Sequence, residues 1–226
     1  MEEDYEFRHF DGRCRLFPLP GVALFPHSVL PLHIFEPRYR QMTQDALASD
    51  KLVAIIQVRP DADWANRTEP QLESVACLGR ILQHERLPDG RFNFLLLGRK
   101  RIKIIRELEV TTLYRQAEVE LLMDHAPQSS EDLRRAELVN QYLDIAKKVD
   151  GLDPDLEAFL RNAPPLGVVT DLLAQALGLP ASVKQELLAE VYVDRRADQI
   201  FEVLQMITRH LADLGLRPFP PPFSVN

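Results

Sequence analysis

Residues Leu16 to Tyr39 read LFPLPGVALFPHSVLPLHIFEPRY, and this stretch decides the fold. Each of its five prolines fixes φ and removes a backbone N–H donor, so one continuous helix cannot span it. The stretch is also densely apolar, and short strands with prolines at edges, bulges or corners satisfy both demands. We therefore predict strands here, followed by a helix that begins near Pro37, because proline suits the first helical position.

The remainder of the first half also has strand character. Five further segments show the short, apolar or alternating pattern of strands: 52–58, 75–87, 91–97, 101–104 and 114–122. Pro88-Asp89-Gly90 separates two of them and predicts a hairpin. Strands joined by hairpins and long returns indicate a six-stranded-type β pseudo-barrel over residues 1–122.

The second half has the three- and four-residue apolar spacing of helices. Five helices joined by short turns predict a helical bundle subdomain over residues 128–215, so the fold class is α+β. Residues 216–226 form a proline-rich tail that must be extended. Its Phe219 and Phe223 would anchor the tail either to its own domain or to a second molecule, so self-association through the tail stays open.

Composition places the chain among ordinary globular proteins, with 46% hydrophobic and 27% charged residues. The sequence has no apolar run near the ~18 residues of a membrane span, and its acidic N-terminus does not resemble a signal peptide. Cys14 and Cys77 are too few for a disulfide framework. We expect a cytoplasmic protein with no membrane association. Residues 121–226 carry 10 Lys and Arg against 16 Asp and Glu, which argues against nucleic acid as a partner.

Motifs for catalysis or metal binding are missing from the sequence. It contains neither the phosphate loop G-x-x-x-x-G-K-[ST] nor the nucleophile elbow G-x-S-x-G. The six histidines form no H-x-x-x-H pair, and the cysteines form no C-x-x-C pair. We therefore predict no catalytic residue, no metal site, no cofactor and no enzymatic activity. An uncharacterised hydrolase remains an alternative.

Two groups of side chains are candidates for binding. In the first, Arg38 and Tyr39 lie at a helix N-terminus, His33 lies just before it, and Trp64 lies in a polar loop over 61–73. The simpler interpretation is structural, with Tyr39 packed inward and His33 a half-buried ring bonded to backbone. The second group lies in the basic segment 99–106 and would serve an RNA-binding module, or a solvated strand face: Arg99, Lys100, Arg101 and Lys103.

The deciding stretch resembles the opening of the Lon protease N-terminal, substrate-binding domain, which also occurs as a free-standing bacterial protein. Leu16–Leu19, Leu24–Pro26 and Leu30–Arg40 match the family pattern L-F-P-L, V-L-F-P-G and L-P-L-H-I-F-E-P-R-Y-R. His27 stands where the family usually has glycine. The resemblance implies a PUA-like β pseudo-barrel followed by a helical bundle.

The resemblance also implies a function. The chain would be a non-catalytic module that holds unfolded or exposed polypeptide segments, without the ATPase and protease domains of full-length Lon. Its further partner would be a protease or a chaperone. Peptide would add along a barrel edge strand or lie between barrel and helices, contacting His33, Arg38, Tyr39 and Trp64.

Overall fold

The computed structural model describes residues 7, 10–59, 69–128, 130–149, 151 and 153–213. Trp64, Phe219 and Phe223 lie outside these described residues, so the interpretations of the loop around Trp64 and of the tail stay predictions. Among the described helices, none combines the length and the apolar character needed to cross a membrane.

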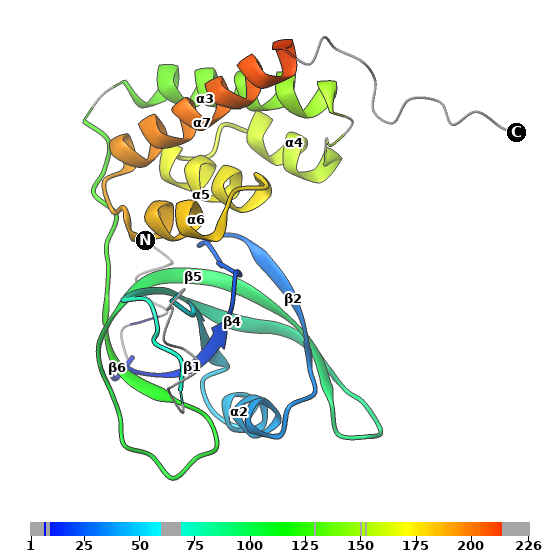
Figure 1. Cartoon of the computed structure of the whole chain (residues 1–226), viewed down its shortest axis with the longest axis vertical. Helices are drawn as coiled ribbons and strands as arrows, with labels where there is room; N and C mark the ends of the chain where they lie inside the picture. Colours follow the sequence, from blue (N-terminus) through cyan, green and yellow to red (C-terminus); the bar gives the residue numbers. More distant parts are fainter. Residues whose placement is uncertain are drawn as a thin grey trace, which may run out of the picture. The chain divides into compact units, whose positions relative to one another are not determined.

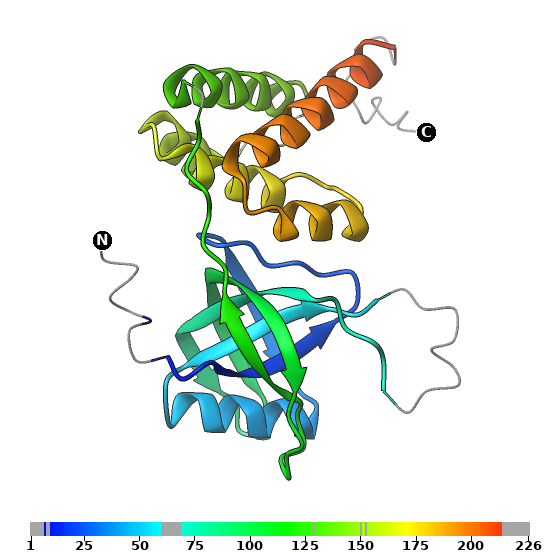
Figure 2. The ribbon, with the colours of Figure 1, turned by 90° about the vertical axis from the view of Figure 1, so that its left-hand side faces the viewer.

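The described strands form one mixed sheet in the order β2-β5-β4-β3-β1-β6, which an additional pairing of β5 with β6 closes (Figures 1 and 2). Their bounds are β1 Arg13–Leu19, β2 Val29–Ile34, β3 Leu52–Gln57, β4 Val75–Arg86, β5 Phe92–Glu107 and β6 Gln116–Leu121. β1 and β3 are parallel, and the other described pairings are antiparallel. The predicted pseudo-barrel and the α+β class are confirmed.

The length of β5 allows the sheet to close. Its first part pairs with both β2 and β4, and its last part, from Ile102 onward, pairs with β6. Gly98 does not interrupt the strand. Instead it lies where the strand crosses the preceding chain, because a Cβ there would come within 2.0 Å of the Phe25 carbonyl oxygen. Only glycine fits such a close backbone approach.

Alternation along the strands builds the barrel core. The buried cluster consists of Phe7, Cys14, Leu16, Leu52, Ala54, Ile56, Ala76, Leu78, Ile102, Ala117 and Val119. Helix α2 (Pro37–Leu47) begins at the proline that the sequence indicated and buries Tyr39, Met42 and Ala46. The apolar side chains of the deciding stretch are buried at three places: Leu16, Phe17 and Ile34 on strands, Ala23, Leu24 and Phe25 between β1 and β2, and Tyr39 on α2.

Helix α6 (Ala181–Ala189) belongs to the same compact unit as the barrel, which comprises Met1–Met123 and Leu177–Ala189. Three hydrogen bonds join it to the strands: Gln57 Nε2 to the Ala181 carbonyl (3.1 Å), Gln185 Nε2 to the Val75 carbonyl (2.9 Å), and Arg101 Nε to the Leu188 carbonyl (3.0 Å). The predicted domain ranges 1–122 and 128–215 differ from this division at α6.

The second compact unit comprises Asp124–Ala176 and Glu190–Asn226. Its described helices are α3 Glu131–Lys148, α4 Pro154–Arg161, α5 Leu166–Ala176 and α7 Val193–Asp213. α3, α5 and α7 pack against one another, and α4 packs against α3. Asp153 caps α4 by accepting from the backbone N–H groups of Asp155 and Leu156, which satisfies donors that the helix itself leaves open.

A buried ionic cluster holds the second unit together. The side chain of Arg196, on α7, is fully buried. Its Nε donates to Thr170 Oγ1 at 2.9 Å and lies 3.4 Å from Asp171 Oδ1, both on α5. Its remaining nitrogens donate to the Asp124 carboxylate and to the Glu190 carbonyl. The cluster therefore ties α5 and α7 to the chain that enters the unit at Asp124.

Candidate functional site

An open groove of about 450 Å³ lies on the part of the sheet where β2, β5 and β4 run side by side. Its lining residues are Pro31, Leu32, His33, Gln83, His84, Glu85, Asn93, Phe94 and Leu95. They come from neighbouring positions on all three strands, since Leu32 and His84 both pair with Phe94. The groove is therefore a surface of the sheet itself and not a gap between loops.

Strand alternation decides which side chains reach the groove. Phe92, Phe94 and Leu96 of β5 are buried, so their face of the sheet looks into the protein. Residues between them point the opposite way, as do their partners on the adjacent strands. The open face therefore carries these side chains: Val29, Pro31 and His33 from β2, Asn93, Leu95 and Leu97 from β5, and Gln83 and Glu85 from β4.

This open face is more apolar than a solvated sheet face requires. Val29 is 47% exposed, and Leu95 and Leu97 are half-buried. Phe35 follows β2 with 60% of its surface exposed, and its ring stacks on His33 at 6.2 Å between centroids. A contiguous exposed apolar surface on a soluble protein commonly marks an interaction site.

A row of hydrogen-bonded polar side chains crosses the apolar face. His33 Nδ1 lies 2.6 Å from Asn93 Oδ1, and Asn93 Nδ2 donates to Glu85 Oε2 at 3.3 Å. On the other side, Arg91 donates from one guanidinium nitrogen to His33 Nε2 at 3.3 Å and from Nε to Asp89 Oδ2 at 2.6 Å. The His33 ring is exposed and its partners are side chains, so the interpretation of a half-buried ring bonded to backbone is wrong.

The outer edge of β2 is poorly suited to receive another strand. Gly98 N donates to the Ser28 carbonyl at 2.8 Å, so the even-numbered residues of β2 direct their backbone groups toward β5. The odd-numbered residues direct theirs outward, and the middle one is Pro31, which has no N–H. An added strand would lose one ladder bond at that position. The exposed face of the ribbon is therefore a better binding surface than its edge.

Arg38 and Tyr39, the other candidates of the deciding stretch, are not among the groove-lining residues. Tyr39 is buried against Phe17 with 4.3 Å between ring centroids, and this burial raises the pKa of its hydroxyl. The guanidinium of Arg38 lies over the Tyr39 ring at 4.5 Å and pairs with Glu36 at 2.8 Å. Glu36 makes no side-chain cap of α2. In the structure, Tyr39 therefore anchors α2, and Arg38 covers it from the solvent side.

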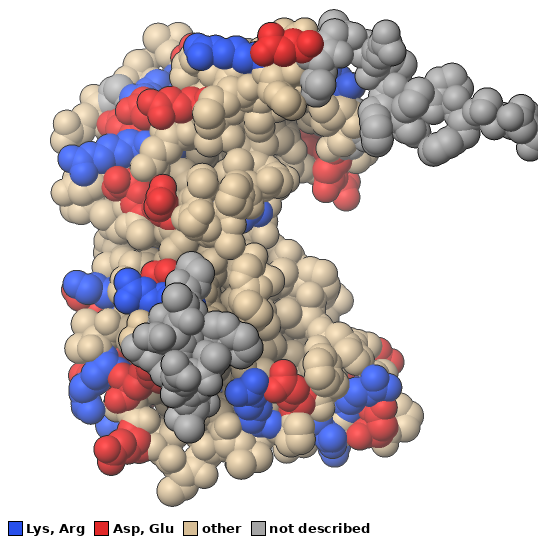
Figure 3. Space-filling view, viewed as in Figure 1, with Lys and Arg blue, Asp and Glu red and all other residues tan. Residues whose placement is uncertain are grey.

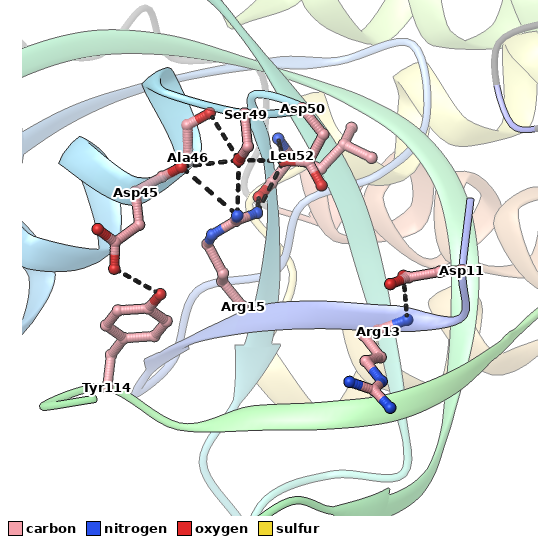
Figure 4. A network of polar contacts seen from close by, with 9 residues as sticks. All are labelled: Asp11, Arg13, Arg15, Asp45, Ala46, Ser49, Asp50, Leu52 and Tyr114. Carbon is pink, nitrogen blue, oxygen red and sulfur yellow. Dashed lines mark hydrogen bonds and ion pairs between the residues drawn. The ribbon is translucent and has the colours of Figure 1, made fainter. Parts of the chain in front are cut away.

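Figure 4 shows the polar network at the other end of α2. Arg15 of β1 donates to Asp50 Oδ1 and to Ser49 Oγ, each at 2.7 Å, close to the last carbonyls of the helix. A cation is favourable at that end because the helix dipole is negative there. Tyr114 donates from its hydroxyl to Asp45 Oδ2 at 2.8 Å. The network holds α2 to the barrel, so the role of its residues is structural.

The thiols and the acidic groups form no reactive centre in the described part of the chain. Burial raises the pKa of the Cys14 thiol to about 12, so it stays protonated and is a poor nucleophile. Cys77 is also buried. Across the described residues, no group of three His, Cys, Asp or Glu side chains is arranged to hold a metal ion.

The basic segment does not assemble into one cationic surface. Arg101 is only 3% exposed and bonds the end of α6, while Arg99 and Lys100 are half-buried and Lys103 is exposed. On the face in Figure 3, basic and acidic side chains are interspersed, without a broad area of one sign. This arrangement offers little to a phosphate backbone, which needs several cations aligned along one path.

Sequence reasoning singled out one groove residue, His33, and missed the others. Asn93 and Leu95 were counted only as residues of a predicted strand, 91–97. The sequence did carry one signal for the groove. Apolar side chains recur at the outward positions of β5, at Leu95 and Leu97, where a solvated face would be polar.

Comparisons with known proteins agree with this architecture. A family model described as the ATP-dependent protease La (LON) substrate-binding domain matches residues 13–206. The Lon protease of Azospirillum brasilense is 26% identical over 85% of this chain, and that of Roseiflexus castenholzii is 30% identical over 84%. The chain spans about a quarter of the length of these relatives, 24% and 23% respectively.

Two solved structures share the fold. The N-terminal domain of Mycobacterium avium complex Lon protease has a TM-score of 0.68 at 17% identity, covering 85% of this chain and 98% of that one. The Lon N-terminal domain protein from Xanthomonas campestris has a TM-score of 0.62 at 18% identity, covering 84% and 97%. With the family model matching most of its length, the chain belongs to the Lon substrate-binding domain family.

Proposed function

We propose that this chain is a non-catalytic module that holds extended, apolar segments of unfolded polypeptide on the open face of β2, β5 and β4. The groove is the observation that carries the proposal, because it combines exposed apolar side chains with polar groups able to bond a peptide backbone. Its volume of about 450 Å³ suits one or two large side chains. Membership of the Lon substrate-binding domain family supports the same class of ligand.

In this proposal the module acts in the cytoplasm and delivers its ligand to a protease or chaperone. Binding to a groove this small is weak for one segment, so the module would favour chains that display several apolar segments. Trp64 remains a proposed contact beyond the described residues, and Arg38 remains a proposed contact outside the groove lining. Tyr39 contributes through α2, which its buried ring anchors.

Replacing Val29 with aspartate is expected to weaken binding of an unfolded protein at least about tenfold. The variant removes a partly exposed valine from the face and puts a charge where an apolar side chain must be desolvated. Fluorescence anisotropy with a dye-labelled, reduced and alkylated protein as ligand measures the change.

Ile105→Asp is the matched control for that measurement. Ile105 is also β-branched and lies on β5, with 52% exposure against 47% for Val29, but it lies outside the part of β5 that pairs with β2. The Ile105→Asp variant should bind the unfolded ligand as the parent protein does. Equal losses in both variants, or no measurable binding by the parent, would exclude the open face of β2, β5 and β4 as the polypeptide site.

A further inference from the structure

The polar row across the groove contains one imidazole, that of His33, and imidazole is the side-chain group that can gain a proton near neutral pH. We propose that the groove releases polypeptide when His33 is protonated. The inference rests on the proposed function, because it concerns the affinity of the same surface. In this proposal the polar row has a regulatory role in addition to its structural one; its members are Asp89, Arg91, His33, Asn93 and Glu85.

The row specifies a single neutral form of His33. A guanidinium has only donors, so the contact with Arg91 requires Nε2 to be the accepting nitrogen. Asn93 leads to the same form, because its Nδ2 donates to the Glu85 carboxylate and its Oδ1 must therefore accept from His33. Two independent partners thus require the neutral ring with its proton on Nδ1.

Protonation breaks one link of the row and leaves the rest intact. An added proton on Nε2 turns that nitrogen into a donor that faces the Arg91 donor, with two like charges about one hydrogen-bond length apart. Arg91 keeps its bonds to Asp89, and Asn93 still accepts from Nδ1. Only the Arg91–His33 contact is lost, so Arg91 is free to leave the rim of the groove.

Other charged groups near His33 have partners of their own. Glu85, from β4, bonds Asn93, and Asp89, in the β4–β5 turn, bonds Arg91. Glu36, beyond the end of β2, pairs with Arg38. On β4, His84 also lines the groove, and the guanidinium of Arg86 lies over the Phe92 ring at 5.9 Å. Arg91 is therefore the charged group in direct contact with the His33 ring.

A bound segment would bury the His33 ring. His33 lines the groove, so an apolar ligand covers the ring and removes water from it. Burial beside apolar groups disfavours the charged form of a histidine. Since binding and protonation are linked reciprocally, a ligand that disfavours the imidazolium must bind more weakly once the imidazolium has formed. Affinity is therefore expected to be full at neutral pH and to fall as the pH falls.

The first test measures affinity for a dye-labelled peptide of about 12 leucine, valine and serine residues with blocked ends, which does not itself titrate. The parent protein should bind it about fivefold more weakly near pH 5.5 than near pH 7.5, the value of about one hydrogen bond. His33→Gln should bind it equally at both pH values. His210→Gln, which changes an exposed histidine of α7 that does not line the groove, should keep the fivefold ratio.

The second test reads the ring directly and needs no ligand. Nitrogen-15 NMR of the histidine side chains near pH 7.5 should show His33 with its proton on Nδ1, and Arg91→Gln should reduce that preference. A ring protonated on Nε2 would overturn the inference. So would a His33→Gln variant that keeps the parent's pH ratio while Val29→Asp still abolishes binding. If neither the parent protein nor the His33→Gln variant binds the peptide at neutral pH, the result would count against the proposed function instead.

Discussion

Replacing Arg196 with methionine is expected to destabilise the helical unit by about 3–5 kcal/mol. Methionine fills much of the space but leaves Asp171 buried beside Thr170 without its cation. It also removes the donors to the Asp124 carboxylate and to the Glu190 carbonyl. Urea denaturation followed by far-UV circular dichroism measures the loss.

Arg209→Met is the control for that experiment, because Arg209 lies on the same helix, α7, but is exposed. Its effect should stay within about 0.5 kcal/mol. If Arg196→Met unfolds at the same urea concentration as Arg209→Met, the buried cluster does not hold the unit together. The comparison separates the loss of a buried partner from the general effect of methionine on helix α7.

The substitution Gly98→Ala is expected to cost about 3 kcal/mol of barrel stability. A Cβ at this position would lie 2.0 Å from the Phe25 carbonyl oxygen and 3.2 Å from Cys77 Sγ. The obstacle is backbone, and it is fixed, since His27 N donates to the Gly98 carbonyl and Gly98 N donates to the Ser28 carbonyl, each at 2.8 Å. The bend between β1 and β2 would have to move away from β5.

Gly178→Ala provides the opposite case within the same compact unit. An added Cβ there meets nothing within 4 Å. Alanine reduces the conformational entropy of the unfolded chain, so Gly178→Ala should leave the free energy of unfolding unchanged or raise it by up to about 1 kcal/mol. Thermal unfolding of the two variants tests the pair, and a Gly98→Ala protein as stable as Gly178→Ala would show that the crossing tolerates a side chain.

Local chemistry made much of the fold predictable. The Pro88-Asp89-Gly90 turn between two predicted strands identified the hairpin from neighbouring residues alone. Pro37 located the start of α2 in the same way. The place of α6 was not predictable, because Gln185 reaches a strand residue, Val75, that lies 110 positions away along the chain. Local patterns carry no record of such partners.

The same limit applied to the candidate sites. Arg101 was counted among exposed cations because its own strand gives no sign that α6 covers it, 87 residues later. His33 was singled out by its place in the deciding stretch, but its partners Asn93 and Glu85 belong to other strands. Register fixes which residues meet across a sheet, and it depends on how the whole barrel closes.

Pro31 has a consequence for how this protein behaves when many copies are present. Proteins that keep apolar sheet surfaces uncovered risk growing into fibrils, because one molecule's border strand templates the next. Here the border strand β2 has a missing donor at Pro31, so a strand of a second copy that paired with it would lose one bond of the ladder. The proline that shapes the fold therefore also weakens edge-to-edge pairing between copies.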